Sequence, residues 1–204
     1  ISMKYLSAYL ISAMQRRSYI DSVYLYIPNQ NQRVVTSDTF LQNVEEVEDR
    51  MWTEDFEGHG LGTSWMSLRN MKKSDFEEEY EVCSVFQRFY QYPGGIVVNY
   101  RADYLTRLMD SMAGMDEQQI LVADRDGNIL MRTSGINWKE AEIPEQETGT
   151  AEWNGETYRF LKKEYEPFQA NIITLVPQSS IYAMAWKNAQ AILFFLVLIL
   201  IVSM

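Results

Sequence analysis

The 204-residue sequence contains one histidine, His59, and one cysteine, Cys83. A single cysteine cannot form an intrachain disulfide or a thiolate metal cluster. A single histidine excludes histidine-rich metal sites and disfavours Ser-His-Asp and Cys-His catalysis. We expect Cys83 to be a small strand residue, since no cationic neighbour is present to activate its thiol. The sequence therefore predicts no metal, no cofactor and no catalytic residue in this part of the protein.

Positive charge is also scarce. Lysine and arginine number 18 against 28 acidic residues, which gives a formal net charge of −10. Nucleic-acid-binding domains carry basic faces, so this composition argues against a nucleic-acid partner. Hydrophobic residues make up 47% and charged residues 23% of the chain, which is typical of a folded globular protein.

Two glycine-containing segments imitate functional motifs without completing them. Residues 124–128 (DRDGN) look like the start of a calcium loop, but the twelfth position of that loop is Gly135 where a bidentate glutamate is needed. The loop from Gly58 to Gly62 lacks the Gly-Lys-Ser/Thr of a phosphate-binding loop. We interpret the first segment as a hairpin turn and the second as a flexible connection that could cover a pocket.

The longest apolar run lies at the end of the sequence, from Ala191 to Val202. A membrane-spanning helix needs about 20 mostly apolar residues. Apolar character extends back to Ala183, and Trp186 and Lys187 lie where an aromatic and cationic interface anchor is expected. We therefore predict that residues 179–204 form a truncated transmembrane helix in contact with membrane lipid. The alternative is a buried terminal helix of a soluble protein.

Hydrophobic periodicity predicts a mixture of helices and antiparallel strands. Apolar residues recur at helical spacing over residues 3–18 and 102–112, and a third helix is expected over 40–51. Alternation places Val23, Leu25 and Ile27 on one face of a strand, with Tyr24 and Tyr26 on the other. The order of elements indicates an α+β fold and lacks the strict alternation of a parallel sheet.

The two halves of the chain begin alike. Residues 21–37 (DSVYLYIPNQNQRVVTS) and 118–134 (QQILVADRDGNILMRTS) both read as strand, polar turn, strand and Thr-Ser. This repeat predicts two similar sheet modules. We expect a stalk helix over 1–18, one module over 19–100, a second over 101–178, and the terminal helix over 179–204. We also expect a segment upstream of Ile1, continuing the stalk helix from a first membrane span.

Three stretches resemble the double Cache, or tandem PAS-like, sensors of bacterial transmembrane receptors. They are GGIVVNYRADYLTRLMDSM, QQILVADRDGNILMRTSG and NIITLVPQSSIYAMAWKNAQAILFF. The similarity is greatest to sensor histidine kinases paired with AraC-type regulators, and membrane-anchored AraC-type regulators carry similar sensors. The resemblance implies two PAS-like modules outside the cytoplasm, the first membrane-distal and the second membrane-proximal, with a C-terminal helix that enters the cell membrane and a possible homodimer. The distal half is short for the family and lacks a clear Tyr-Arg-Asp signature for amino-acid binding.

Aromatic and basic residues in the first half are candidates for a site that binds an unknown small molecule. The candidate ligand-binding residues are Tyr24, Tyr26, Trp52, Trp65, Arg69 and Arg88. Aromatic side chains line most ligand pockets, and arginine can form a bidentate contact with a carboxylate or phosphate. Many of these residues could instead be core. Two other functions remain open: a membrane-tethered extracytoplasmic enzyme, and a structural ectodomain without a ligand.

Overall fold

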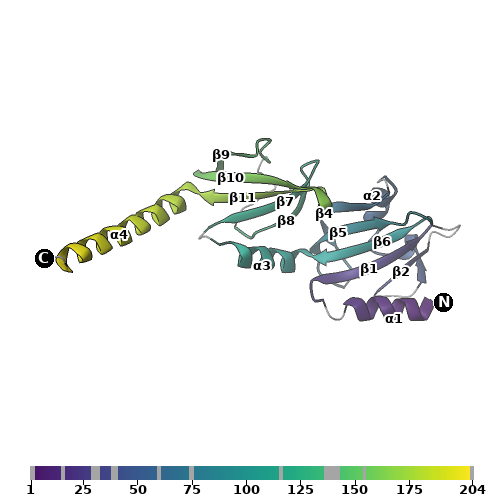
Figure 1. Ribbon diagram of the computed structural model, residues 1–204. Helices are drawn as coiled ribbons and strands as arrows, with labels where there is room; N and C mark the ends of the chain where they lie inside the picture. Colours follow the sequence, from purple (N-terminus) through teal and green to yellow (C-terminus); the bar gives the residue numbers. More distant parts are fainter. Residues whose placement is uncertain are drawn as a thin grey trace.

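The computed structural model describes residues 3–14, 17–28, 33–37, 41–58, 61–73, 76–114, 117–135, 143–153 and 155–202. The described chain forms two separate antiparallel sheets that follow one another along the molecule, with helices at the ends and between them (Figure 1). The expected α+β class with antiparallel sheets is confirmed.

The first sheet has six strands in the order β3-β2-β1-β6-β5-β4. The strands are β1 (Ile20–Ile27), β2 (Arg33–Thr36), β3 (Leu41–Asn43), β4 (Thr63–Met71), β5 (Tyr80–Arg88) and β6 (Gly95–Arg101). Each pairs antiparallel with its neighbour, and β1 and β6 lie at the centre, with Val23 opposite Val98.

Helices cover both faces of this sheet. α1 (Met3–Met14) places Leu10 against Val23 and Val35. On the opposite face, α2 (Trp52–Gly58) and the preceding 3-10 turn (Val44–Glu46) cover Tyr24 and Tyr26. The predicted alternation along β1 is confirmed: Val23 and Leu25 lie on the α1 side of the sheet, and Tyr24 and Tyr26 lie on the α2 side.

The second sheet has five strands in the order β8-β7-β11-β10-β9. It is reached through α3 (Ala102–Met112), which starts directly after β6. The strands are β7 (Gln119–Asp124), β8 (Ile129–Arg132), β9 (Thr148–Trp153), β10 (Glu156–Tyr165) and β11 (Ala170–Pro177), with a 3-10 turn (Glu166–Phe168) before β11. Without its edge strand β3, the first sheet has the same relative order.

The repeated Thr-Ser sequence supplies a hydroxyl residue to the first strand of each sheet, but through different members of the pair. Ser37 donates its backbone N–H to Val23 O at 3.0 Å, and its Oγ accepts the N–H of Val23 at 3.2 Å. Thr133 makes the equivalent pair with Ile120, at 3.0 and 3.1 Å. In each hairpin, a hydroxyl residue directly after the second strand satisfies the backbone of the first strand: Ser37 is the second residue of its Thr-Ser pair, and Thr133 is the first residue of its pair.

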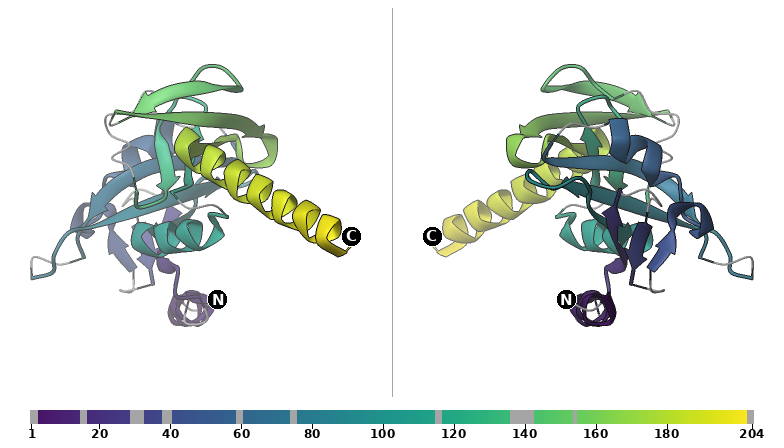
Figure 2. Two further views of the ribbon diagram at one scale, coloured as in Figure 1. Left: turned by 90° about the vertical axis from the view of Figure 1, so that its left-hand side faces the viewer. Right: turned by 90° about the vertical axis from the view of Figure 1, so that its right-hand side faces the viewer.

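The last helix, α4 (Gln178–Val202), extends away from the second sheet, and its far end is remote from α1 (Figures 1 and 2). Several of its apolar side chains are exposed, including those of Trp186, Ile192 and Phe194. Within the described ranges, no helix combines the length and hydropathy needed to cross a membrane.

Two local predictions were wrong. The helix expected over 40–51 is absent from the described part of that range, which contains β3 and a 3-10 turn. Leu41 and Asn43 instead pair with β2, and the side chains of Asn43 and Glu46 close a capping box. The first helix ends at Met14, and described residues 17–19 form a turn rather than helix to residue 18.

Candidate ligand-binding site

The most polar part of the first sheet's interior is organised around the carboxylate of Asp49. This residue lies in the irregular segment between the 3-10 turn and α2, and its side chain is 5% exposed. The Arg69 guanidinium, on β4, donates Nη1 to Oδ1 at 2.7 Å and Nη2 to Oδ2 at 2.8 Å. The result is a buried bidentate ion pair, the geometry in which arginine recognises a carboxylate best.

Side chains from the central strands complete this cluster. Tyr24 on β1 donates its hydroxyl to Asp49 Oδ2 at 3.1 Å, and Asn99 on β6 donates Nδ2 to the same oxygen at 3.4 Å. Arg69 Nη2 also donates to Ser84 Oγ at 3.2 Å and Asn99 Oδ1 at 3.3 Å. Burial and the neighbouring Asp49 carboxylate raise the pKa of Tyr24 above its ordinary value, so the phenol stays protonated and donates.

An aromatic cluster adjoins the polar cluster on the same face of the sheet. The ring of Trp52 is 5.8 Å from Tyr24 and 5.4 Å from Tyr26, and Phe56 is edge-on to Tyr26 at 5.3 Å. Trp52 is fully buried, and its indole N–H donates to Asp49 O at 2.9 Å. The aromatic rings thus hold α2 on the sheet and fix the backbone that carries Asp49.

A small pocket of about 110 Å³ opens beside this cluster. Its lining comes from β1, β2, β3, the segment 46–49 and the two residues after β4. The lining residues are Tyr24, Thr36, Gln42, Glu46, Val47, Glu48, Asp49, Lys72 and Lys73. Both Tyr24 and Asp49 therefore belong to the pocket wall and to the buried hydrogen-bond network. The pocket can admit only a small molecule, since pockets for drug-sized ligands have volumes of about 300–1000 Å³.

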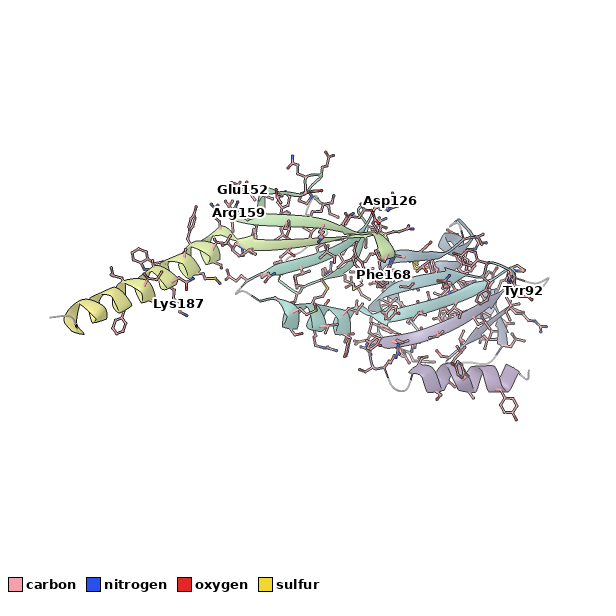
Figure 3. All side chains as sticks on the ribbon, in the orientation of Figure 1. Tyr92, Asp126, Glu152, Arg159, Phe168 and Lys187 are labelled. Atoms are coloured by element: carbon pink, nitrogen blue, oxygen red, sulfur yellow. The ribbon has the colours of Figure 1, made fainter. Side chains whose placement is uncertain are left out.

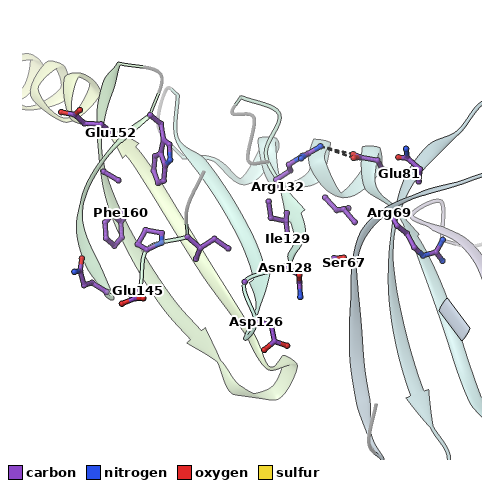
Figure 4. A pocket seen from close by; sticks show the side chains of 18 of the residues that line it. Ser67, Arg69, Glu81, Asp126, Asn128, Ile129, Arg132, Glu145, Glu152 and Phe160 are labelled. Atoms are coloured by element: carbon purple, nitrogen blue, oxygen red, sulfur yellow. Dashed lines mark hydrogen bonds and ion pairs between the residues drawn. The ribbon is translucent and has the colours of Figure 1, made fainter. Parts of the chain in front are cut away.

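A much larger, open cleft of about 1500 Å³ lies between the two sheets (Figure 4). Ser67 and Arg69 of β4 border one side, and the β7–β8 hairpin with Asp126 and Asn128 borders the middle. Phe160 and Glu152 of the second sheet border the other side. The Arg132 guanidinium crosses the cleft to Glu81 at 3.1 Å and joins the two sheets.

The structure separates the six predicted site residues into groups. Tyr24, Tyr26 and Trp52 belong to the aromatic cluster. The Arg88 guanidinium lies over the ring of Phe56, another member of that cluster, 5.3 Å from the ring centre. Arg69 faces Asp49. Trp65 lies elsewhere: its indole N–H donates to Phe168 O at 2.8 Å, at the junction of the two sheets (Figure 3).

Sequence reasoning missed Asp49, Asn99, Ser84 and Ser22, which are all buried. The strand alternation contained a signal for three of them. Ser22 shares a face with Tyr24, Ser84 with Phe86, and Asn99 with Val97, so each is a polar residue at an inward position. Buried polar groups need partners, and three such positions on neighbouring strands indicate a network. Nothing local identifies Asp49, which lies outside the strands.

No protein-family model and no curated protein matches this sequence. Solved structures with a similar fold include the ligand-binding domain of the Pseudomonas fluorescens chemoreceptor CtaA in complex with L-alanine. It has a TM-score of 0.62 and 13% identity over 88% of this chain and 81% of that chain. The extracellular domain ascribed to the histidine kinase soHK1S-Z6 has a TM-score of 0.60 and 14% identity over 90% of this chain and 80% of that one.

The periplasmic sensory domain of the Campylobacter jejuni chemoreceptor Tlp1 is a third example. It has a TM-score of 0.60 and 10% identity over 89% of this chain and 81% of that chain. At these identities the similarity establishes a shared fold. The chain thus has the architecture found in extracellular sensory domains of histidine kinases and chemoreceptors.

Proposed function

We propose that the chain is the extracytoplasmic ligand-sensing domain of a transmembrane signalling receptor. The observation that carries the proposal is the similarity of both sheets together, over about nine-tenths of the chain, to sensory domains of receptors. A histidine kinase is the favoured receptor type because the sequence resemblance is greatest to such kinases, and the extracellular domain of one is among the similar structures, together with domains of chemoreceptors. The AraC-type pairing rests on the sequence resemblance alone, and an AraC-type regulator is the second candidate.

The domain division predicted from sequence fits this function. Residues 19–100 would form the membrane-distal PAS-like module and residues 101–178 the membrane-proximal one. The ligand would bind in the distal module, where the small pocket meets the Asp49 cluster. Tyr24, Trp52 and Arg69 are the predicted site residues that contact or support this place.

Two contacts between the sheets offer a route from such a site to the C-terminal helix. Trp65 and Arg69 lie on the same strand, and Trp65 holds Phe168 just before β11. Glu81, on the neighbouring strand, holds Arg132 of β8. The second sheet in turn contacts α4, where Ser179 donates its hydroxyl to Glu156 Oε1 at 2.6 Å. A ligand that favours one arrangement of the distal module would thereby displace α4.

A ligand screen tests the sensing function. The 204-residue chain in detergent is heated with amino acids, other carboxylates, sugars and short peptides, and its melting temperature is compared with that in buffer. A ligand at tenfold its dissociation constant should raise the melting temperature by about 3–6 °C. If a hit is found, changes at Trp52 and Arg69 should weaken it. A hit that is indifferent to both changes would contradict the site but leave sensing in place.

We also propose that residues 191–204 insert into the membrane, because apolar side chains at the start of this segment are exposed on α4. A fusion of residues 1–204 to a reporter should sediment with membranes and require detergent for release. Residues 1–180 with the same reporter are the matched control and should remain in the supernatant. Sedimentation of both, or of neither, would contradict the proposed anchor.

A further inference from the structure

The donors described around the Asp49 carboxylate come from the sheet. They belong to Tyr24 on β1, Arg69 on β4 and Asn99 on β6. Asp49 itself lies on the covering segment, outside the sheet. The strands therefore form a receptor for one carboxylate group, and the covering segment supplies that group.

The receptor has internal supports that do not involve Asp49. Arg69 is also held by Ser84 Oγ and Asn99 Oδ1, and its Nε lies 3.2 Å from Met66 Sδ. Ser84 in turn fixes Asn99 by donating its hydroxyl to Asn99 Oδ1 at 2.6 Å. Asn99 Nδ2 donates to Ser22 Oγ at 2.9 Å. Fixed donors lower the cost of ordering a site around a ligand. The donor geometry should thus persist if Asp49 leaves.

A buried ion pair is a costly way to attach a covering segment. Removing both charges from water costs several kcal/mol per ion, and apolar residues of similar size often give equal or higher stability. The aromatic cluster around Trp52 and Phe56 already attaches α2 by apolar contacts. The Asp49–Arg69 pair is therefore not needed merely to close the fold, which leaves open a role in binding.

Arg69 lines the larger cleft, whereas the small pocket gives a free molecule access to two other members of the cluster. Asp49 and Tyr24 line it directly. Residues 47–50 have no helix or strand structure, and Glu48 and Arg50 on either side of Asp49 are exposed. The Asp49 side chain can consequently turn outward without breaking a strand pair of the sheet, while the Trp52 hydrogen bond to Asp49 O and the buried Val47 hold the backbone of this segment.

We infer that Asp49 is an internal substitute for the carboxylate of a small ligand, which would displace it from Arg69, Tyr24 and Asn99. This inference rests on the proposed sensing function and specifies its ligand class as a small carboxylate. Displacement of Asp49 removes the polar attachment of residues 47–50 to the sheet, so binding and loosening of the covering segment are one event. The apparent affinity of the ligand equals its intrinsic affinity multiplied by the fraction of molecules in which Asp49 has left the receptor.

Chemical rescue of the Asp49→Ala variant tests this inference. The variant retains Arg69 and its supports but lacks the internal carboxylate. Added formate or acetate should raise its melting temperature saturably, by about 3–6 °C at tenfold the dissociation constant, relative to chloride at equal ionic strength. The wild-type chain should show less than a third of that shift at the same concentration. The additional Arg69→Met change should abolish the response.

Asp103→Ala is the matched control, because Asp103 forms an ion pair with Arg101 in which both side chains are nearly half exposed. This variant should respond equally to acetate and chloride. If Asp49→Ala is unfolded in chloride, refolding by acetate, followed by circular dichroism, becomes the readout. Asp49→Ser, which keeps one acceptor for Tyr24, is the second variant.

The inference is overturned if neither Asp49 variant distinguishes formate or acetate from chloride, or if Arg69→Met leaves the response intact. This outcome is separable from failure of the proposed function. Rescue of Asp49→Ala can succeed even when the wild-type screen yields no ligand, which would contradict sensing alone. Conversely, a sugar or peptide bound by the wild type without rescue of the variant would support sensing and reject the carboxylate class.

Discussion

Replacement of Arg69 by methionine should be among the most destabilising single changes in this chain. The side chains of Arg69 and Asp49 are 4% and 5% exposed, so the change leaves a buried carboxylate without its cation. The hydrogen bonds from Tyr24 and Asn99 would remain on that carboxylate, and neither supplies a positive charge. Breaking a buried pair by removing one partner costs about 3–5 kcal/mol. At roughly 2–4 °C per kcal/mol for a chain of this size, the melting temperature should fall by roughly 6–20 °C.

The control for this measurement is Arg101→Met, which removes the cation of an exposed pair and should cost about 0–1 kcal/mol. Both variants are compared with the wild type by urea denaturation, followed by tryptophan fluorescence. The double change Asp49→Leu and Arg69→Met removes both charges, so it should be clearly less destabilised than Arg69→Met alone. Equal stabilities of Arg69→Met and Arg101→Met would refute the assignment of Asp49–Arg69 as a buried, strongly coupled pair.

Three further predictions concern other parts of the fold. Trp65→Phe keeps the ring contact with Phe168 but loses the indole hydrogen bond to the Phe168 carbonyl. The free energy of unfolding, measured by urea denaturation, should fall by about 0.5–1.5 kcal/mol. An unchanged value would contradict this hydrogen bond. Gly94→Ala should lower the free energy of unfolding by about 1–3 kcal/mol, because φ is 112° and the new Cβ would lie 2.3 Å from Tyr26 O. Gly155→Ala is the comparison and should lower it by less, because φ is 77° but the space around Gly155 is open. Burial raises the pKa of Cys83 from 9.0 to about 12, so folding favours the protonated thiol. The resulting contribution to the free energy of unfolding is fully present below pH 9 and is lost as the pH rises toward 12. Denaturation between pH 8 and 10.5 should therefore show a shallower alkaline loss of stability for Cys83→Ala, and equal slopes would contradict this prediction.

Local patterns in the sequence were sufficient to predict much of the fold. Alternation assigned opposite faces of β1 to Val23 and Tyr24, and both are buried, because helices cover both faces of the sheet. Helical spacing located α3 correctly at 102–112. Leu108 and Met112 continue the same apolar spacing, yet they are 47% and 67% exposed. Periodicity gives the direction of a helix face, but not how far the neighbouring sheet extends beneath it.

The helix predicted over 40–51 failed for a different reason. Acidic residues at Glu45, Glu46 and Glu48 suit the solvent side of a helix, and the same residues suit a solvated turn. The pairing of Leu41 and Asn43 with β2 favours the solvated turn over the helix. Such pairing is a property of the assembled sheet and cannot be read from the local sequence. Tertiary contacts override weak local preferences in this way.

The candidate site shows the same limit more clearly. Arg69 and Tyr24 could be selected from composition, since their side chains are common in binding sites. Their shared partner Asp49 lies 20 residues before Arg69 in a segment without regular structure. The contact of Trp65 with Phe168 joins residues 103 positions apart. Both contacts exist only because a covering segment, or a second sheet, is brought against β4. Whether Arg69 faces solvent, a ligand or an internal carboxylate therefore depends on the arrangement of layers around the strand, and this arrangement turns a predicted ligand contact into a buried ion pair.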